Sequence, residues 1–96
     1  MSPLKKKKLY KIRAELDKLD NALIEIIKKR TNLVKKVLVL KEKKNQIIDQ
    51  KRIKKILTNI KKKSLKNNID PKITNRIWKN MIWSYIDFEK RNFGKK

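Results

Sequence analysis

The chain has 96 residues, which indicates one domain, and its 30 Lys and Arg against 9 Asp and Glu give a net charge of +21. It contains no His and no Cys, which excludes His general bases, His or Cys metal sites, thiol nucleophiles and disulfides. Its single glycine, Gly94, excludes a glycine-rich phosphate loop.

The positive charge has two interpretations. It favours an anionic partner such as nucleic acid or a membrane surface. However, Lys, Ile and Asn make up half of the chain and share AT-rich codons, so a genome of low GC content would produce the same excess without selection for charge. In either case the chain carries a positive field that attracts anions.

The apolar runs are short. The longest, residues 37–40, has four residues, far fewer than a membrane span needs. The basic tail at about residues 1–8 is not followed by an apolar run of signal-peptide length. We therefore expect a soluble, cytoplasmic protein that does not enter a membrane, with one domain over residues 1–96.

The first predicted helix runs from about Leu4 to about Lys43. Its apolar residues follow steps of three and four, which places them on one helical stripe. A helix of this length extends about 60 Å, whereas a compact domain of this size has a radius of gyration near 13 Å. Its own chain cannot cover it, so a partner helix is expected, most simply from a second copy. The stripe comprises Leu9, Ile12, Leu16, Leu19, Leu23, Ile26, Leu33, Val37 and Leu40.

Two shorter helices are predicted after a loop at residues 44–48. Asp49 is an N-cap for the second helix, which runs to about Lys66. A turn at residues 67–68 precedes Asp70-Pro71, a strong helix start, and the third helix ends near residues 93–94. No strand pattern is present, so the fold class is all-α, with a long, a short and a medium helix. The apolar faces comprise Ile53, Ile56, Leu57 and Ile60 in the second helix, and Ile73, Ile77, Trp78, Met81, Ile82, Tyr85 and Ile86 in the third.

Two charged residues interrupt these apolar faces: Arg30 in the first helix and Glu89 in the third. A buried charge is costly unless it is paired or used. Arg30 also fits a residue that sets the pairing register or extends its charge to solvent, and Glu89 fits a frayed helix end that faces water.

Two further basic residues, Arg13 and Lys41, are four heptads apart and share a helix face, and Lys41 lies on nearly the same face as Arg30. Arg13 and Lys41 would lie about 42 Å apart on one helix, but an antiparallel partner centred near Ile27 would place Arg13 of one chain opposite Lys41 of the other. Arg30 and Lys41 would be separated by about 16 Å along the axis, so that their long side chains could grip a small dianion. Alternatively, Arg13 and Lys41 are ordinary flanking charges of a coiled coil.

The combined spacing of these residues resembles that of the all-helical chorismate mutases over about residues 9–89. No single motif is specific, whereas their conjunction with chain length and helix order is fairly specific. The matching positions are Ile12-Arg13, Leu19-Asp20, Arg30 ten residues later, Lys41 eleven further, Asp49 and Arg52 as Asp-x-x-Arg, and Glu89 where the family has Gln or Glu.

The resemblance implies an intertwined, antiparallel helical homodimer with two sites, each completed by Arg13 from the partner chain. The implied reaction is the Claisen rearrangement of chorismate to prephenate, a step toward phenylalanine and tyrosine, which needs no nucleophile, metal or cofactor. Catalysis would come from holding the dicarboxylate in its reactive shape and stabilising the charge that develops as the ether bond breaks.

The roles implied by the resemblance are specific. Arg13 and Arg30 would bind the two carboxylates, since a guanidinium matches a carboxylate with two hydrogen bonds. Lys41 would donate to the ether oxygen, and Glu89 would do the same when protonated. Arg52 and the region of Asp49 would close over the ring and its hydroxyl.

Two positions depart from the family's usual pattern. Ile53 stands where the family usually has a Glu that holds the ring hydroxyl, and Tyr85 aligns with a position that is often a small Ser. Both features are similar to the related isochorismate pyruvate lyases, so lyase activity is the alternative. A third hypothesis, from another class, is a basic helical protein that binds nucleic acid or an acidic partner. Against it, no recognised nucleic-acid motif is present.

Overall fold

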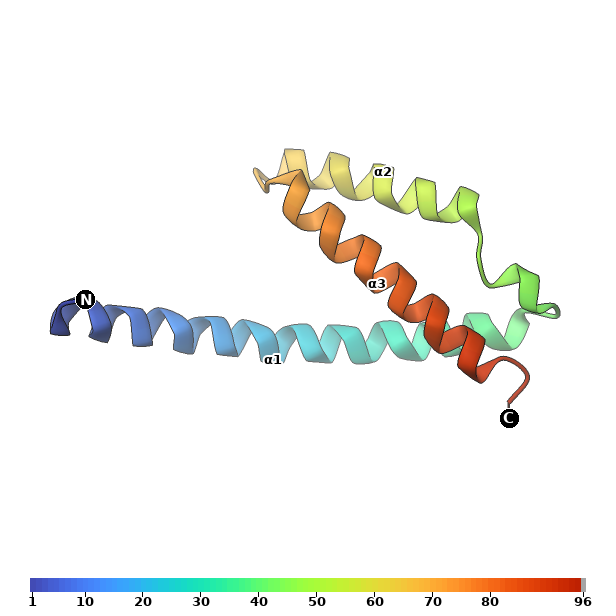
Figure 1. The fold of residues 1–96 in the computed structure, drawn as a ribbon, viewed down its shortest axis with the longest axis horizontal. Helices are drawn as coiled ribbons and strands as arrows, with labels where there is room; N and C mark the ends of the chain where they lie inside the picture. Colours follow the sequence, from blue (N-terminus) through green and yellow to red (C-terminus); the bar gives the residue numbers. More distant parts are fainter. Residues whose placement is uncertain (96) are drawn as a thin grey trace. The chain divides into compact units, whose positions relative to one another are not determined.

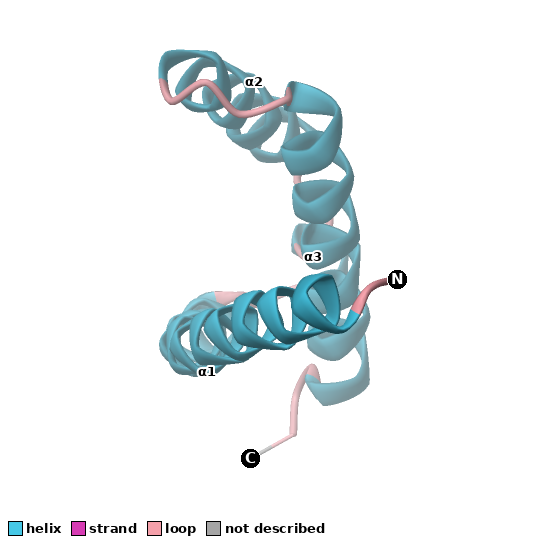
Figure 2. Ribbon diagram, turned by 90° about the vertical axis from the view of Figure 1, so that its left-hand side faces the viewer, coloured by secondary structure: helices cyan, strands magenta, loops and turns pink. Residues whose placement is uncertain are grey.

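The computed structural model describes residues 1–95, which contain three α-helices, one short 3₁₀ helix and no strand (Figures 1 and 2). This confirms the all-α class and the order of a long, a short and a medium helix. No helix in this part of the chain combines the length and apolar character needed to cross a bilayer. The elements are α1 (Pro3–Leu40), η1 (Lys44–Gln46), α2 (Gln50–Lys66) and α3 (Pro71–Asn92).

Internal contacts group the chain into two units, Met1–Leu33 and Val34–Lys96. The first unit consists mainly of the N-terminal part of α1. Here the Ser2 hydroxyl accepts a hydrogen bond from the backbone N–H of Lys5 at 3.2 Å. Pro3 begins α1, a position where its missing N–H is not needed.

The apolar stripe of α1 is not covered within the first unit. Leu16, Leu19 and Leu23 keep 53%, 65% and 52% of their surface exposed. No residue of α1 is buried. The predicted helical stripe is therefore present, and the first unit by itself leaves it open.

The second unit contains the end of α1, η1 and a hairpin of α2 and α3. Asp49 caps α2 by accepting a hydrogen bond from the backbone N–H of Arg52 at 3.0 Å, and Asp70 caps α3 by accepting from that of Lys72 at 2.9 Å. At the turn between the helices, Asn68 has a positive φ of 55°, a conformation that Asn tolerates better than most residues. These findings confirm both predicted helix starts and the predicted turn.

The α2–α3 hairpin has a small apolar core. Ile86 of α3 and Ile47, which lies between η1 and α2, keep only 5% and 4% of their surface exposed. The half-buried residues of the hairpin include the whole predicted apolar face of α2 and most of that of α3: Ile53, Ile56, Leu57, Ile60, Trp78, Met81, Ile82 and Tyr85.

Two predicted core residues of α3 are exposed instead. Ile73 and Ile77 keep 56% and 52% of their surface exposed. Thr74 takes the inner position, and its hydroxyl lies 2.6 Å from that of Ser64, which is 3% exposed. A hydroxyl pair therefore occupies part of the helix contact, and the stripe that contains Ile73 and Ile77 faces away from it.

The end of α1 also differs from the prediction. α1 ends at Leu40 rather than near Lys43, and the predicted loop contains the 3₁₀ turn η1. In a continuing helix, the N–H groups of Glu42 and Lys43 would bond to carbonyls four residues earlier. They instead donate to the side-chain oxygen of Gln46, at 2.8 and 2.9 Å. The side-chain oxygen of Gln46 thus takes the place of the backbone carbonyls that would accept these hydrogen bonds in a longer helix.

Candidate active site

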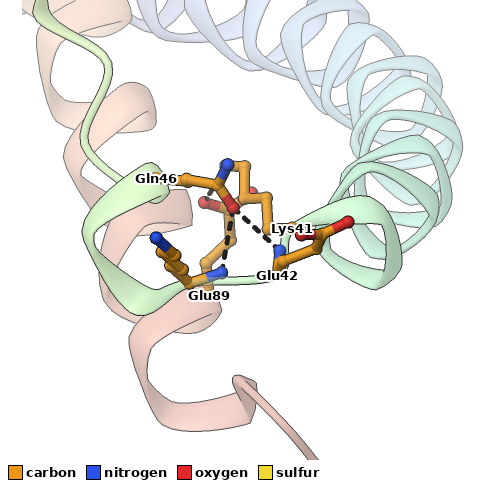
Figure 3. Close-up of polar contacts among 5 residues, drawn as sticks. Lys41, Glu42, Gln46 and Glu89 are labelled. Carbon is orange, nitrogen blue, oxygen red and sulfur yellow. Dashed lines mark hydrogen bonds and ion pairs between the residues drawn. The ribbon is translucent and has the colours of Figure 1, made fainter.

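The second unit contains a buried ion pair between two predicted site residues. Lys41, directly after α1, and Glu89, near the end of α3, approach to 2.9 Å between Nζ and Oε2 (Figure 3). Their side chains keep only 18% and 8% of their surface exposed. The interpretation of Glu89 as a frayed helix end that faces water is therefore wrong, because α3 continues to Asn92 and directs Glu89 inward.

Packing explains why Glu89 is inside. It lies three residues after the buried Ile86 and therefore on the same face of α3. A carboxylate at such a position requires a partner, because its transfer out of water is costly when it is unpaired. The Lys41 ammonium is that partner, and it retains two further N–H donors, since an ammonium has three and Glu89 takes one.

The backbone that follows Lys41 is held by a residue that the sequence analysis missed. The side-chain carbonyl oxygen of Gln46 accepts hydrogen bonds from the backbone N–H groups of Glu42 and Lys43 (Figure 3). Gln46 occupies the third position of η1, where a Gln side chain can reach back to the N–H of the residue before the turn, but Lys43 lacks the side-chain acceptor that would complete a recognisable capping box in the sequence.

Asp49, Arg52 and Ile53 lie together at the start of α2. The Asp49 carboxylate is engaged as the N-cap by accepting from the Arg52 backbone N–H, and the Arg52 side chain is exposed. Ile53 is half-buried on the face of α2 that meets α3. The first turn of α2 therefore offers one exposed guanidinium followed by an apolar side chain.

Tyr85 and Glu89 share one face of α3. They are four residues apart on the same helix, the spacing at which side chains become neighbours. Tyr85 is half-buried and Glu89 is buried. The structure thus brings Lys41 and Glu89 together, with Tyr85 on the same face of α3 as Glu89.

Arg13 and Arg30 belong to the first unit, and both side chains are exposed. They lie 17 residues apart on α1, which corresponds to about 26 Å along the helix axis. This distance exceeds the span of a small dicarboxylate. One copy of the chain therefore cannot direct both guanidinium groups to one such molecule.

A groove on the α2–α3 hairpin contains none of the predicted site residues. Within residues 1–95, no group of three or more His, Cys, Asp or Glu side chains is placed to hold a metal ion. A groove of about 440 Å³ lies between α2 and α3, at the end near the connecting turn. It is lined by Lys54, Leu57, Thr58, Lys61, Pro71, Lys72 and Asn75.

Comparison with protein families gives one match that spans most of the chain. The family model described as chorismate mutase type II matches residues 12–90. No curated protein and no solved structure matches the chain. The matched range includes Arg13 at one end and Glu89 at the other, with the Lys41–Glu89 pair inside it. By its sequence and its all-α fold, this chain belongs to the chorismate mutase type II family.

Proposed function

We propose that this protein is a chorismate mutase, which converts chorismate to prephenate by an intramolecular Claisen rearrangement. The observation that carries the proposal is the buried Lys41–Glu89 pair, in a chain of the chorismate mutase type II family. A buried ion pair is weak evidence for stabilisation, because the loss of hydration offsets most of the attraction. A fixed, partly dehydrated ammonium is, however, an effective donor to an oxygen that gains negative charge.

The proposed reaction breaks the ether C–O bond and forms a C–C bond within one molecule. The protein has to hold the substrate in its reactive shape and stabilise the charge on the ether oxygen. Lys41 has two N–H donors beyond the one directed to Glu89, and we assign one of them to the ether oxygen. Glu89 accepts from Lys41 in the structure and would itself donate to that oxygen only when it carries a proton.

The two carboxylates of the substrate are assigned to Arg13 and Arg30. A guanidinium binds a carboxylate through two parallel hydrogen bonds. Because the two residues are about 26 Å apart on one helix, a site that uses both needs Arg13 from a second chain. The proposal therefore includes a homodimer.

The exposed stripe of α1 supports the homodimer. Leu16, Leu19, Leu23 and Ile26 lie between Arg13 and Arg30 in the sequence and keep at least half of their surface exposed. Burying one such side chain contributes about 1.5–3 kcal/mol, so a second copy that covers the stripe would gain considerable stability. An antiparallel arrangement would bring Arg13 of one chain to the other end of the partner's stripe.

One observation favours a second candidate function, isochorismate pyruvate lyase. Ile53 directly follows Arg52 and is half-buried, so no carboxylate is available at that position to bind a ring hydroxyl. An apolar residue there would suit elimination of pyruvate from isochorismate on the same fold. A donor to the ether oxygen serves both reactions, since each breaks the ether C–O bond, and we retain the mutase as the proposal because the matching family model is that of chorismate mutase type II.

A paired assay tests these assignments. Purified protein is given chorismate and isochorismate separately, and prephenate and pyruvate are measured. We expect prephenate formation, its loss in Arg30→Ala, and its retention in Lys29→Ala, which removes the same charge from the neighbouring exposed position of α1. Pyruvate release from isochorismate without turnover of chorismate would establish the lyase instead, and no turnover of either substrate by a folded protein would exclude both.

A further inference from the structure

The chain changes direction directly after Lys41, and one side chain holds this change in place. The Oε1 atom of Gln46 accepts two hydrogen bonds, from the backbone N–H of Glu42 at 2.8 Å and from that of Lys43 at 2.9 Å (Figure 3). These are the two peptide groups that follow Lys41. The conformation of the backbone next to Lys41 is therefore set by an acceptor supplied from η1.

The end of α1 leaves Lys41 dependent on this support. The backbone N–H of Lys41 still bonds to the carbonyl of Leu38, at 3.1 Å, in the last turn of the helix. The next two N–H groups have left the helical ladder, and Gln46 replaces the carbonyls they would have found. Lys41 thus lies between the end of α1 and a short segment, Glu42-Lys43, that is held by the side-chain amide of Gln46.

The backbone of Gln46 is in turn anchored to the core of the second unit. Its backbone N–H bonds to the carbonyl of Lys43 at 3.0 Å, which closes the short turn η1. The next residue, Ile47, keeps only 4% of its surface exposed. The buried Ile47 side chain therefore fixes the turn. From this fixed turn, the Gln46 side chain holds the two peptide groups after Lys41 in place.

We infer that Gln46 is a positioning residue for Lys41, acting through the backbone of Glu42 and Lys43 to aim the ammonium. The inference rests on the proposed function and adds to it a residue that does not touch the substrate. A displacement of about 1 Å at a reacting group can reduce a rate by about 100-fold. Losing the double acceptor releases the backbone beside Lys41, and with it the direction of the donor.

The test compares Gln46→Leu with Gln46→Glu. Leu has a similar size but no acceptor, whereas a Glu oxygen can still accept from both N–H groups. We expect kcat for chorismate to fall by about 10- to 100-fold in Gln46→Leu, with KM changed far less, because the donor acts as charge develops in the transition state. Gln46→Glu is expected to keep most of the wild-type kcat.

A stability control separates positioning from general loss of structure. Asp70→Ala removes a cap of comparable type at the start of α3, outside the proposed machinery. At a temperature where circular dichroism shows both variants folded, it should leave kcat unchanged. Equal losses of kcat in Asp70→Ala and Gln46→Leu would overturn the inference.

A double-mutant cycle gives the decisive readout. If Gln46 acts through Lys41, the Gln46→Leu substitution should cost nothing further in the Lys41→Ala background. Losses that multiply in the double mutant would overturn the inference and leave the proposed function intact, since the latter is tested by wild-type turnover and by Arg30→Ala. If neither chorismate nor isochorismate is turned over, the proposed function fails. The test of Gln46 is then the coupling free energy between Lys41 and Glu89, obtained from a double-mutant cycle in urea unfolding. A smaller coupling free energy in the Gln46→Leu background than in the wild-type background supports the inference, and an unchanged value overturns it.

Discussion

Removing Glu89 should leave a partly buried ammonium without its partner. In Glu89→Leu the Lys41 side chain retains its charge and loses the carboxylate that lies 2.9 Å away. Breaking a buried ion pair from one side costs about 3–5 kcal/mol. Lys41 still has 18% of its side-chain surface exposed, so some hydration survives, and we expect a loss of about 2–3 kcal/mol in the free energy of unfolding.

The assay is urea unfolding followed by circular dichroism, at one fixed protein concentration because any self-association would add to the apparent stability. For a chain of 96 residues, the expected loss lowers Tm by about 10–20 °C. Asp87→Leu is the matched control, since it removes a carboxylate from an exposed position of the same helix. It should change stability by no more than about 0.5 kcal/mol.

The double substitution Lys41→Met with Glu89→Leu removes both charges and should regain most of the stability lost in Glu89→Leu. The reasoning would be refuted if Glu89→Leu were as stable as Asp87→Leu. That result would mean that the ammonium is adequately hydrated without its partner and that the burial of the pair has no energetic consequence.

Three other predictions concern the dimer, the side chain at position 89 and the hairpin. Mixing inactive Arg13→Ala and Arg30→Ala chains should restore about a quarter of the wild-type activity, because half of the dimers are mixed and each has one intact site; no recovery after subunit exchange would argue against sites shared between chains. Glu89→Gln keeps a side-chain N–H donor and should retain turnover of chorismate, whereas Glu89→Leu has no donor and should lose it; equal rates in the two variants would remove a donor role at this position. Ser64→Ala should lower the free energy of unfolding by about 1 kcal/mol, because the Thr74 hydroxyl loses its 2.6 Å partner; an unchanged urea midpoint would contradict this.

The helices were predictable because their signals are local. The caps at Asp49 and Asp70 each satisfy N–H groups two or three residues away, so the sequence alone contains both partners of the hydrogen bond. The stripe of α1 is likewise a matter of spacing along one helix. The end of α1 was misplaced by about three residues, because the acceptor that terminates it is a side chain in the following turn.

The sequence suggested candidate site residues but not their arrangement. Spacing and family resemblance identified Lys41 and Glu89, but the pattern of α3 also allowed Glu89 to face water at a frayed end. Its 6% exposure follows from which face of α3 is turned inward, and that depends on packing between segments distant in the sequence. The same packing places Thr74 rather than Ile73 against α2, with Ser64 as its partner.

By itself, the sequence determined the helical class, the helix starts and the set of charged residues that could act on a dianion. It also excluded His and Cys chemistry, since neither residue occurs. Only the tertiary structure decided that Lys41 and Glu89 meet, and that Gln46 holds the backbone beside them. The physical reason is that helix formation depends on neighbours a few residues apart, whereas an ion pair between residues 48 positions apart requires the whole second unit to fold.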